Sequence, residues 1–291
     1  MKAQLFSIIA GSEACNARCP FCISKMTPLW GIELKEPEVN WRNFRIAANY
    51  AKQAGAITAM LTSKGEPTLF PEQITKYLKA LKEHDFPLLE LQTNGILLYE
   101  QQQKYDTFLN EWYGLGLTTV AVSISHYDPE ANRQIYLPHK DKYINLPGLV
   151  DNLHAKGYSV RLACVMADGF IHSPEGLEKL IAFARENEVE QLTVRPVNKP
   201  QNPRNGNIET WVDSHFLKDK QLRDITAYLS EKGHQLMKLP HGATVYDVNG
   251  QNVCMANSLT IEKEGEDVRQ LIFFPDGHLR FDWQYKGAVL L

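Results

Sequence analysis

The first two thirds of the chain alternate between short apolar runs and longer segments with helical periodicity. The apolar runs are bounded by turn residues, as expected of strands covered on both faces. Six such runs predict strands: Leu5–Ala10, Ala56–Thr62, Leu88–Gln92, Leu117–Ser125, Tyr158–Met166 and Gln191–Pro196. Apolar residues at helical spacing predict helices between them: Val39–Gln53, Pro71–His84, Glu100–Trp112, Lys142–Lys156 and Pro174–Asn187.

This alternation predicts parallel strands with helices outside the sheet, because consecutive βα units arrange in that way. The six units are fewer than the eight of a closed (β/α)₈ barrel. We therefore expect an α/β fold in which residues 1–200 form a partial (β/α)₆ barrel of parallel strands with outer helices.

The character of the chain changes after Pro196. A loop rich in Pro, Asn and Gly is followed by one helix and two strand segments, and Pro275–His278 turns the second segment into a hairpin. These elements are expected at Asn198–Asn207, His215–Lys232, Thr244–Thr260 and Val268–Trp283. Residues 201–291 should thus form a C-terminal α+β extension, a helix and β-hairpin cap over the open barrel.

Composition and charge exclude several classes of protein. With 44% hydrophobic and 22% charged residues, the chain has an ordinary globular composition. A formal net charge of -3 argues against a nucleic-acid partner, because such proteins neutralise phosphates with excess basic residues. No apolar run reaches the roughly 18 residues of a membrane span. The apolar start is too short for a signal peptide, so we expect a cytoplasmic protein.

The cysteines carry the strongest chemical signal. Three of the five fall in the CxxxCxxC segment formed by Cys15, Cys19 and Cys22, which suits a metal in a reducing compartment rather than disulfides. Three thiolates can ligate three irons of a cubane cluster and leave one iron open to another ligand. A structural zinc site would need a fourth ligand, whereas Cys164 and Cys254 are single and distant.

The CxxxCxxC segment follows the first strand, has Phe21 directly before its last cysteine, and resembles the radical S-adenosylmethionine (SAM) superfamily. The resemblance extends over roughly residues 5 to 200. It implies that Cys15, Cys19 and Cys22 hold a [4Fe–4S] cluster whose fourth iron is chelated by SAM. Reductive cleavage of SAM then gives a 5′-deoxyadenosyl radical that abstracts a substrate hydrogen, and Phe21 lies near the adenine. An electron donor such as flavodoxin or ferredoxin is also implied.

Two strand ends carry further family motifs. Gly65-Glu66-Pro67 after the second strand resembles the GGEP motif that meets the SAM amino group. Lys64 replaces the first glycine and puts the local backbone conformation in question, because a Cβ restricts what glycine allows. Thr93 and Asn94 after the third strand resemble a family sequence that lines the SAM site.

The fourth and fifth strands add polar side chains. Ser123 and Ser125 share one side of their strand; facing the barrel interior they would bind the SAM ribose, as in the family, and otherwise they face solvent. Arg161 lies inside an apolar strand, where an unpaired charge is costly. Resemblance to molybdopterin-type enzymes implies the SAM carboxylate as its partner, and an edge salt bridge is the alternative.

The substrate-contacting candidates are Lys64 and Arg195. Arg195 ends the sixth strand, where barrel sites lie, and suits a substrate anion. The segment 126–136 is either a substrate loop or an exposed loop, and no residue is assigned to catalysis.

Cys254 is the only cysteine beyond residue 200, and one cysteine cannot hold a second cubane. The chain is therefore expected to be a single-cluster member, resembling the molybdopterin/PQQ-type branch without its auxiliary cluster. It would act on a small molecule or peptide. A glycyl-radical activase and a non-catalytic Fe–S or zinc protein are the alternatives.

Overall fold

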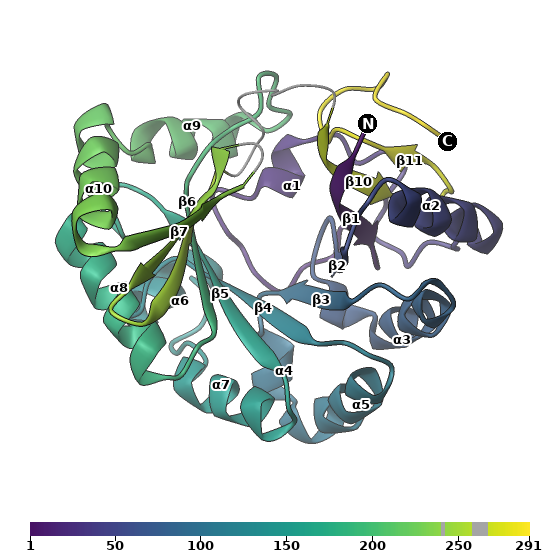
Figure 1. Ribbon diagram of the computed structural model, residues 1–291, viewed down its shortest axis with the longest axis horizontal. Helices are drawn as coiled ribbons and strands as arrows, with labels where there is room; N and C mark the ends of the chain where they lie inside the picture. The colour runs from purple at the N-terminus through teal and green to yellow at the C-terminus, as the bar shows by residue number, and fades with distance from the viewer. Residues whose placement is uncertain (240–241, 258–266) are drawn as a thin grey trace.

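The computed structural model describes residues 1–239, 242–257 and 267–291. The strands in these ranges form one sheet with the order β11-β10-β1-β2-β3-β4-β5-β6-β9-β8-β7. The sheet curls into an open barrel with the helices around its outside (Figure 1). Among the described residues, no helix is both long and apolar enough to cross a membrane.

The predicted α/β partial barrel is confirmed. Neighbouring strands from β1 to β6 pair in parallel, each with the next along the chain. Their bounds are β1 (Ala3–Ile9), β2 (Thr58–Thr62), β3 (Leu88–Thr93), β4 (Thr119–Ile124), β5 (Ser159–Met166) and β6 (Gln191–Pro196). The main covering helices are α2 (Trp41–Gln53), α3 (Pro71–Leu81), α4 (Ile96–Glu100), α5 (Gln102–Gly114), α7 (Leu146–Ala155) and α8 (Pro174–Glu186).

The C-terminal part extends this sheet at both ends. β9 (Gln251–Met255) pairs in parallel with β6, and β10 (Val268–Phe273) pairs in parallel with β1. Antiparallel strands follow outside them: β11 (Leu279–Arg280) beside β10, and β8 (Thr244–Val248) with β7 (His234–Lys238) beside β9. The division at residue 200 stays a prediction, but residues on both sides of it share one sheet.

Several C-terminal elements differ from the expectation. The strand expected at Thr244–Thr260 is two strands, β8 and β9, because Asn249 and Gly250 adopt positive φ and turn the chain; residues 258–260 lie outside the described ranges. The helix expected at His215–Lys232 is α10 (Asp219–Lys232), and it is preceded by a further helix that was not predicted, α9 (Gly206–His215). The hairpin at Pro275–His278 is confirmed, since β10 and β11 pair across it.

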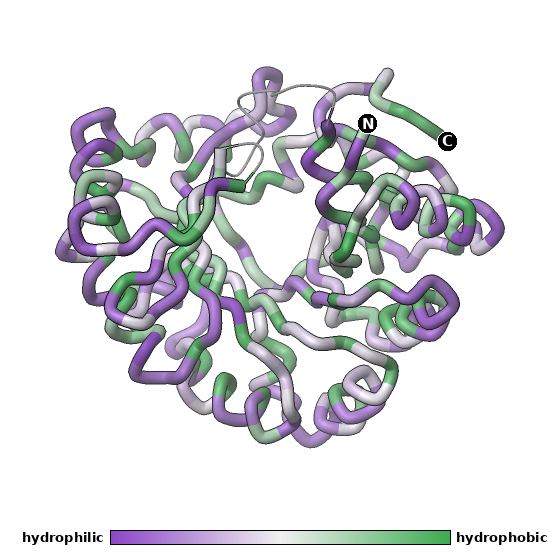
Figure 2. Tube along the Cα trace, in the orientation of Figure 1, coloured by the Kyte–Doolittle hydropathy of each residue, from purple (hydrophilic) through white to green (hydrophobic). Residues whose placement is uncertain are grey.

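Alternation along the parallel strands separates an apolar outer face from a polar inner face. Outer-face residues are buried against the helices and include Leu91, Val120, Val122, Leu162 and Val194. Inner-face residues include Glu90, Gln92, Ser123, Arg161 and Arg195, which alternate with them. Figure 2 shows hydrophobic positions among the strands and hydrophilic ones along the outer turns. This pattern leaves polar chemistry to the barrel interior.

The shared sheet makes a stability prediction for the first 200 residues. A chain ended after residue 200 would lack β9 and β10, so β1 and β6 would have unpaired edges. We expect this fragment to aggregate or to melt well below the full chain, measured by size-exclusion chromatography and thermal denaturation. A monomeric fragment that melts cooperatively at the temperature of the full chain would contradict the prediction.

Candidate functional site

The three clustered cysteines lie on one loop at the carboxyl edge of the sheet. The loop follows β1 and ends in the short helix α1 (Ile23–Met26), whose N-cap is Cys22. Cys15 is exposed, whereas Cys19 and Cys22 are partly buried. The structure thus keeps the three sulfur atoms on one loop, as the spacing predicts.

The thiols of this loop influence one another. Burial raises the pKa of Cys19, and the charges of Cys22 and Cys15 raise it further. Cys15 keeps an exposed surface, but the protein atoms around its sulfur remove enough solvent to raise its pKa to about 11, although the Ala17 amide, 3.4 Å from the sulfur, opposes this rise. Metals are ligated by thiolates, so a bound cation is what would hold these groups deprotonated.

The loop after β2 packs directly against the cysteine loop. The Glu66 amide donates to the Ala14 carbonyl at 2.9 Å, and Ser63 Oγ donates to the Ser12 carbonyl at 2.9 Å. A Cβ on Gly65 would lie 2.0 Å from the Ala14 carbonyl oxygen. Glycine is therefore required at position 65 for the close approach of two backbones.

Lys64 stands where the family motif has its first glycine. Its φ is not positive, so a side chain is accommodated there without backbone strain. Lys64 is buried, with Nζ 2.7 Å from Thr27 Oγ1 and 5.0 Å from the centroid of the Trp283 ring. Burial lowers the pKa of Lys64 to about 7, while the charge of Cys22 raises it and that of Arg204 lowers it. Lys64 is thus a buried amine close to the cysteine loop.

The Glu66 carboxylate connects the ends of β2 and β3. Its Oε1 accepts from the Thr68 amide at 3.0 Å, from Thr68 Oγ1 at 2.6 Å and from Thr93 Oγ1 at 2.6 Å. Its Oε2 accepts from the Asn94 amide at 2.9 Å. Burial raises the pKa of Glu66, and these four donors oppose that rise. The carboxylate is therefore occupied by protein groups and positions the loops around it.

Asn94 extends this network to the cysteine loop. Its Nδ2 donates to Asn16 Oδ1 at 2.7 Å and lies 4.0 Å from Cys15 Sγ. Its Oδ1 accepts from the Ile96 amide at 3.0 Å, which fixes the orientation of the side chain amide. The predicted residues Gly65, Glu66, Thr93 and Asn94 thus form one continuous network with the loop that carries Cys15.

The two serines of the fourth strand differ in accessibility. Ser123 is partly exposed on the inner face, whereas Ser125, just past the end of β4, is 1% exposed. Asn132 fixes this strand end, because its Oδ1 accepts from the amides of Ser125 at 2.9 Å and His126 at 3.1 Å. Asn132 is a positioning residue that the sequence interpretation missed.

Segment 126–136 was expected to be a loop, either at the substrate or exposed to solvent. This prediction was wrong, because most of the segment is the helix α6 (Pro129–Tyr136). The Asp128 side chain caps this helix and Pro129 occupies its first turn, which is the local signal that could have revealed it. The Tyr136 carbonyl accepts from the Arg18 amide at 3.0 Å. Helix α6 therefore supports the cysteine loop as well as the end of β4.

The two inner-face arginines have different partners. Arg161 pairs with Glu90 of β3, across the intervening strand β4. No ion pair to Arg195 is found within the described ranges, and the Arg195 Nε is buried without a hydrogen-bond partner. Glu90 was not predicted as a site residue, since only the strand register shows that it is within reach of Arg161.

Phe21 joins the cysteine loop to α9. Its ring lies 5.7 Å from Trp211 of α9 and 6.3 Å from Tyr136, measured between ring centroids. Trp211 in turn stacks on His215 at 3.9 Å. Two tryptophans of the C-terminal part, Trp211 and Trp283, thus contact groups beside the cysteine loop, whereas Tyr246 belongs to the main core.

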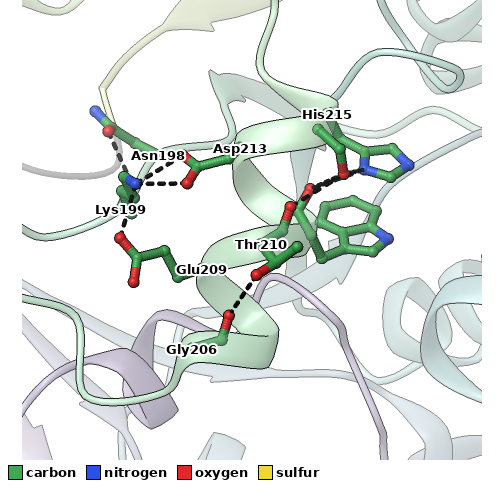
Figure 3. A network of polar contacts seen from close by, with 9 residues as sticks. Asn198, Lys199, Gly206, Glu209, Thr210, Asp213 and His215 are labelled. Carbon is green, nitrogen blue, oxygen red and sulfur yellow. Dashed lines mark hydrogen bonds and ion pairs between the residues drawn. The ribbon is translucent and has the colours of Figure 1, made fainter.

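Helix α9 is held to the segment after β6 by charged groups. Lys199 Nζ lies 2.9 Å from Glu209 Oε1 and 2.7 Å from Asp213 Oδ1, and both carboxylates project from one side of α9 (Figure 3). Below this network, Ile208 and Val212 pack in a small apolar cluster with Met26 of α1. The C-terminal helix α9 therefore covers the end of the cysteine loop.

Comparisons with known proteins agree with this geometry. The model of the Radical SAM superfamily matches residues 9–184. Over 181 residues the chain is 24% identical to GTP 3′,8-cyclase of Aeromonas hydrophila subsp. hydrophila, which covers 62% of this chain and 50% of that protein. The chain thus spans half the length of this curated relative.

Solved structures share the fold at low identity. SuiB of Streptococcus suis bound to S-adenosylmethionine superposes with a TM-score of 0.60 at 15% identity, covering 96% of this chain and 60% of SuiB. A radical SAM methyltransferase from Sphaerobacter thermophilus gives a TM-score of 0.56 at 14% identity, covering 87% of this chain and 66% of that one. These similarities show that the partial barrel and its C-terminal strands are a shared architecture.

The close approach at Gly65 predicts a strong effect of a single methyl group. Gly65→Ala places a Cβ against the Ala14 carbonyl, so the loops must separate, at a cost of about 1–3 kcal/mol in the free energy of unfolding. Denaturant unfolding measures this cost. Gly206→Ala is the matched control, because nothing lies within 4 Å of its Cβ position. Equal stability of the two variants would show that the loops tolerate separation.

Proposed function

The chain belongs to the radical SAM superfamily, and on this basis we propose that it is an enzyme that cleaves SAM reductively at a single [4Fe–4S] cluster. When bound, the cluster and SAM supply a 5′-deoxyadenosyl radical that abstracts hydrogen from the substrate. The observation that carries the proposal is the network that joins the CxxxCxxC loop to the ends of β2 and β3. Glu66 and Asn94 are its central members.

Cys15, Cys19 and Cys22 are the proposed cluster ligands. Burial and the neighbouring thiols raise the pKa of Cys15 and Cys19, so a bound cation is what would hold these groups as thiolates.

The SAM contacts follow from the strand ends. We assign the adenine to the side of Phe21, the ribose to Ser123, which is the more accessible serine, and the amino group to the backbone at Gly65 and Pro67. Glu66, Thr93, Asn94 and Ser125 are assigned to shaping this site, because their polar groups are buried or bonded within the protein.

Arg161 is proposed to face the SAM carboxylate. Its pairing with Glu90 holds the guanidinium on the inner face and leaves other donors of the fork available, since arginine carries five N–H groups. Lys64 is proposed to contact the substrate, because it is a buried amine between the cysteine loop and Trp283.

The substrate is proposed to be a small molecule or a peptide, with a flavodoxin or ferredoxin as electron donor and the cytoplasm as location. SuiB, which has the same fold, was solved with its precursor peptide SuiA. The open inner face with polar and charged side chains is the feature of this chain that suits such a substrate.

Loss of one cluster ligand gives the decisive test. Anaerobically reconstituted, dithionite-reduced protein should convert SAM to 5′-deoxyadenosine, and Cys19→Ala should lower both iron content and turnover at least a hundredfold. Cys164→Ala is the matched control, because Cys164 is a fully buried cysteine of β5 that lies outside the CxxxCxxC loop. It should keep its iron and its turnover.

Two outcomes would contradict the proposal. Equal turnover by Cys19→Ala would remove the ligand assignment. A colourless wild-type protein that binds zinc stoichiometrically and takes up no iron would make the chain a structural metalloprotein.

A further inference from the structure

Three arginines from separate strands lie close enough to Cys254 of β9 for their charges to act on its thiol. Burial raises the pKa of the Cys254 thiol, and the positive charges of Arg161, Arg195 and Arg269 oppose this rise. Arg161 and Arg195 come from the adjacent strands β5 and β6, whereas Arg269 comes from β10 at the other side of the opening. Arg269 reaches the chain just after β9, because its Nη1 donates to the Asn257 carbonyl at 2.9 Å.

The cluster contains more positive than negative charge. Glu90 is paired with Arg161, and no carboxylate in the described ranges forms an ion pair with Arg195 or Arg269. Burial lowers the pKa of Arg195 to about 10, and the charges of Arg161 and Arg269 lower it further. Burial lowers the pKa of Arg269 as well. Like charges held together away from water are costly unless an anion joins them.

The unbonded N–H group of the Arg195 guanidinium indicates what kind of group would bind here. The Nε atom of Arg195 is buried without a hydrogen-bond partner. A guanidinium binds phosphate or carboxylate oxygens with two parallel N–H bonds, so an unfilled donor on Arg195 and the nearby charge of Arg269 match the oxygens of one anion. Arg161 is paired with Glu90, whereas Arg195 and Arg269 form no ion pair with any residue of 1–239, 242–257 and 267–291.

We propose that Arg195 and Arg269 together bind an anionic group of the substrate, a phosphate or a pair of carboxylates, from opposite sides of the barrel opening. The anion site rests on the proposed function in one respect: the molecule that carries the anion is taken to be the substrate of the radical reaction. The anion neutralises two charges contributed by the barrel wall and by the C-terminal strand β10. The C-terminal region thus contributes directly to substrate binding.

Anion binding by the SAM-loaded holoprotein tests the proposal. Inorganic phosphate and succinate serve as separate probes, followed by equilibrium dialysis and by the rise in melting temperature. Wild-type protein should bind one of them saturably at one per chain, and the tighter probe identifies the substrate group. Arg195→Gln and Arg269→Gln should each weaken binding at least tenfold, and Arg195→Lys should weaken it less. Arg185→Gln, on the exposed side of α8, is the matched control and should bind normally.

Folding is monitored in the same experiment. Without anion, Arg195→Gln should melt at or above the wild-type temperature, because it removes one of the crowded charges. The proposal is overturned if wild-type protein binds neither probe, or if both glutamine variants bind as wild type does. Formation of 5′-deoxyadenosine by the same samples separates the two claims: absent cleavage with intact, arginine-dependent anion binding would overturn the proposed function and support the anion site.

Discussion

The buried carboxylate of Glu66 is the interaction on which the arrangement of the site depends. It accepts four hydrogen bonds from the ends of β2 and β3, and a carboxylate in such surroundings must have these donors to remain buried. The donors in turn fix Asn94, which reaches Asn16 in the cysteine loop. The position of the cysteines is thus set by a group that is not itself available to a ligand.

The network around Glu66 and the arginines on the inner face differ in how their charges are compensated. Both oxygens of the Glu66 carboxylate are matched by donors of the protein, which holds the surrounding loops in place. Around Cys254, in contrast, Arg195 and Arg269 lack carboxylate partners in the described part of the chain. The hydrogen-bonded Glu66 carboxylate holds the cofactor-binding loops in place. Arg195 and Arg269 are the groups that we propose bind the substrate.

Sequence patterns predicted the six strands because apolar runs bounded by turns specify strands locally, and β6 agrees residue for residue. They also placed Gly65, Glu66 and Asn94 at strand ends, which parallel pairing brings to one edge. The pairs Ala3 with Val268 and Arg161 with Glu90 were beyond such reasoning, because they depend on strand order and register. Asn132 was missed because its role depends on a helix read as a loop.

The pairing of β10 with β1 also has a consequence for how the chain is made. Lys2 and Asp267, joined by a hydrogen bond of 2.9 Å, are 265 positions apart. A ribosome therefore releases β1 and β2 long before β10, the other neighbour of β1, has been made, so the pairing of β1 with β10 can form only at the end of synthesis. During synthesis the first strand has a free edge, so nascent chains depend on rapid completion or on chaperones to avoid pairing with one another.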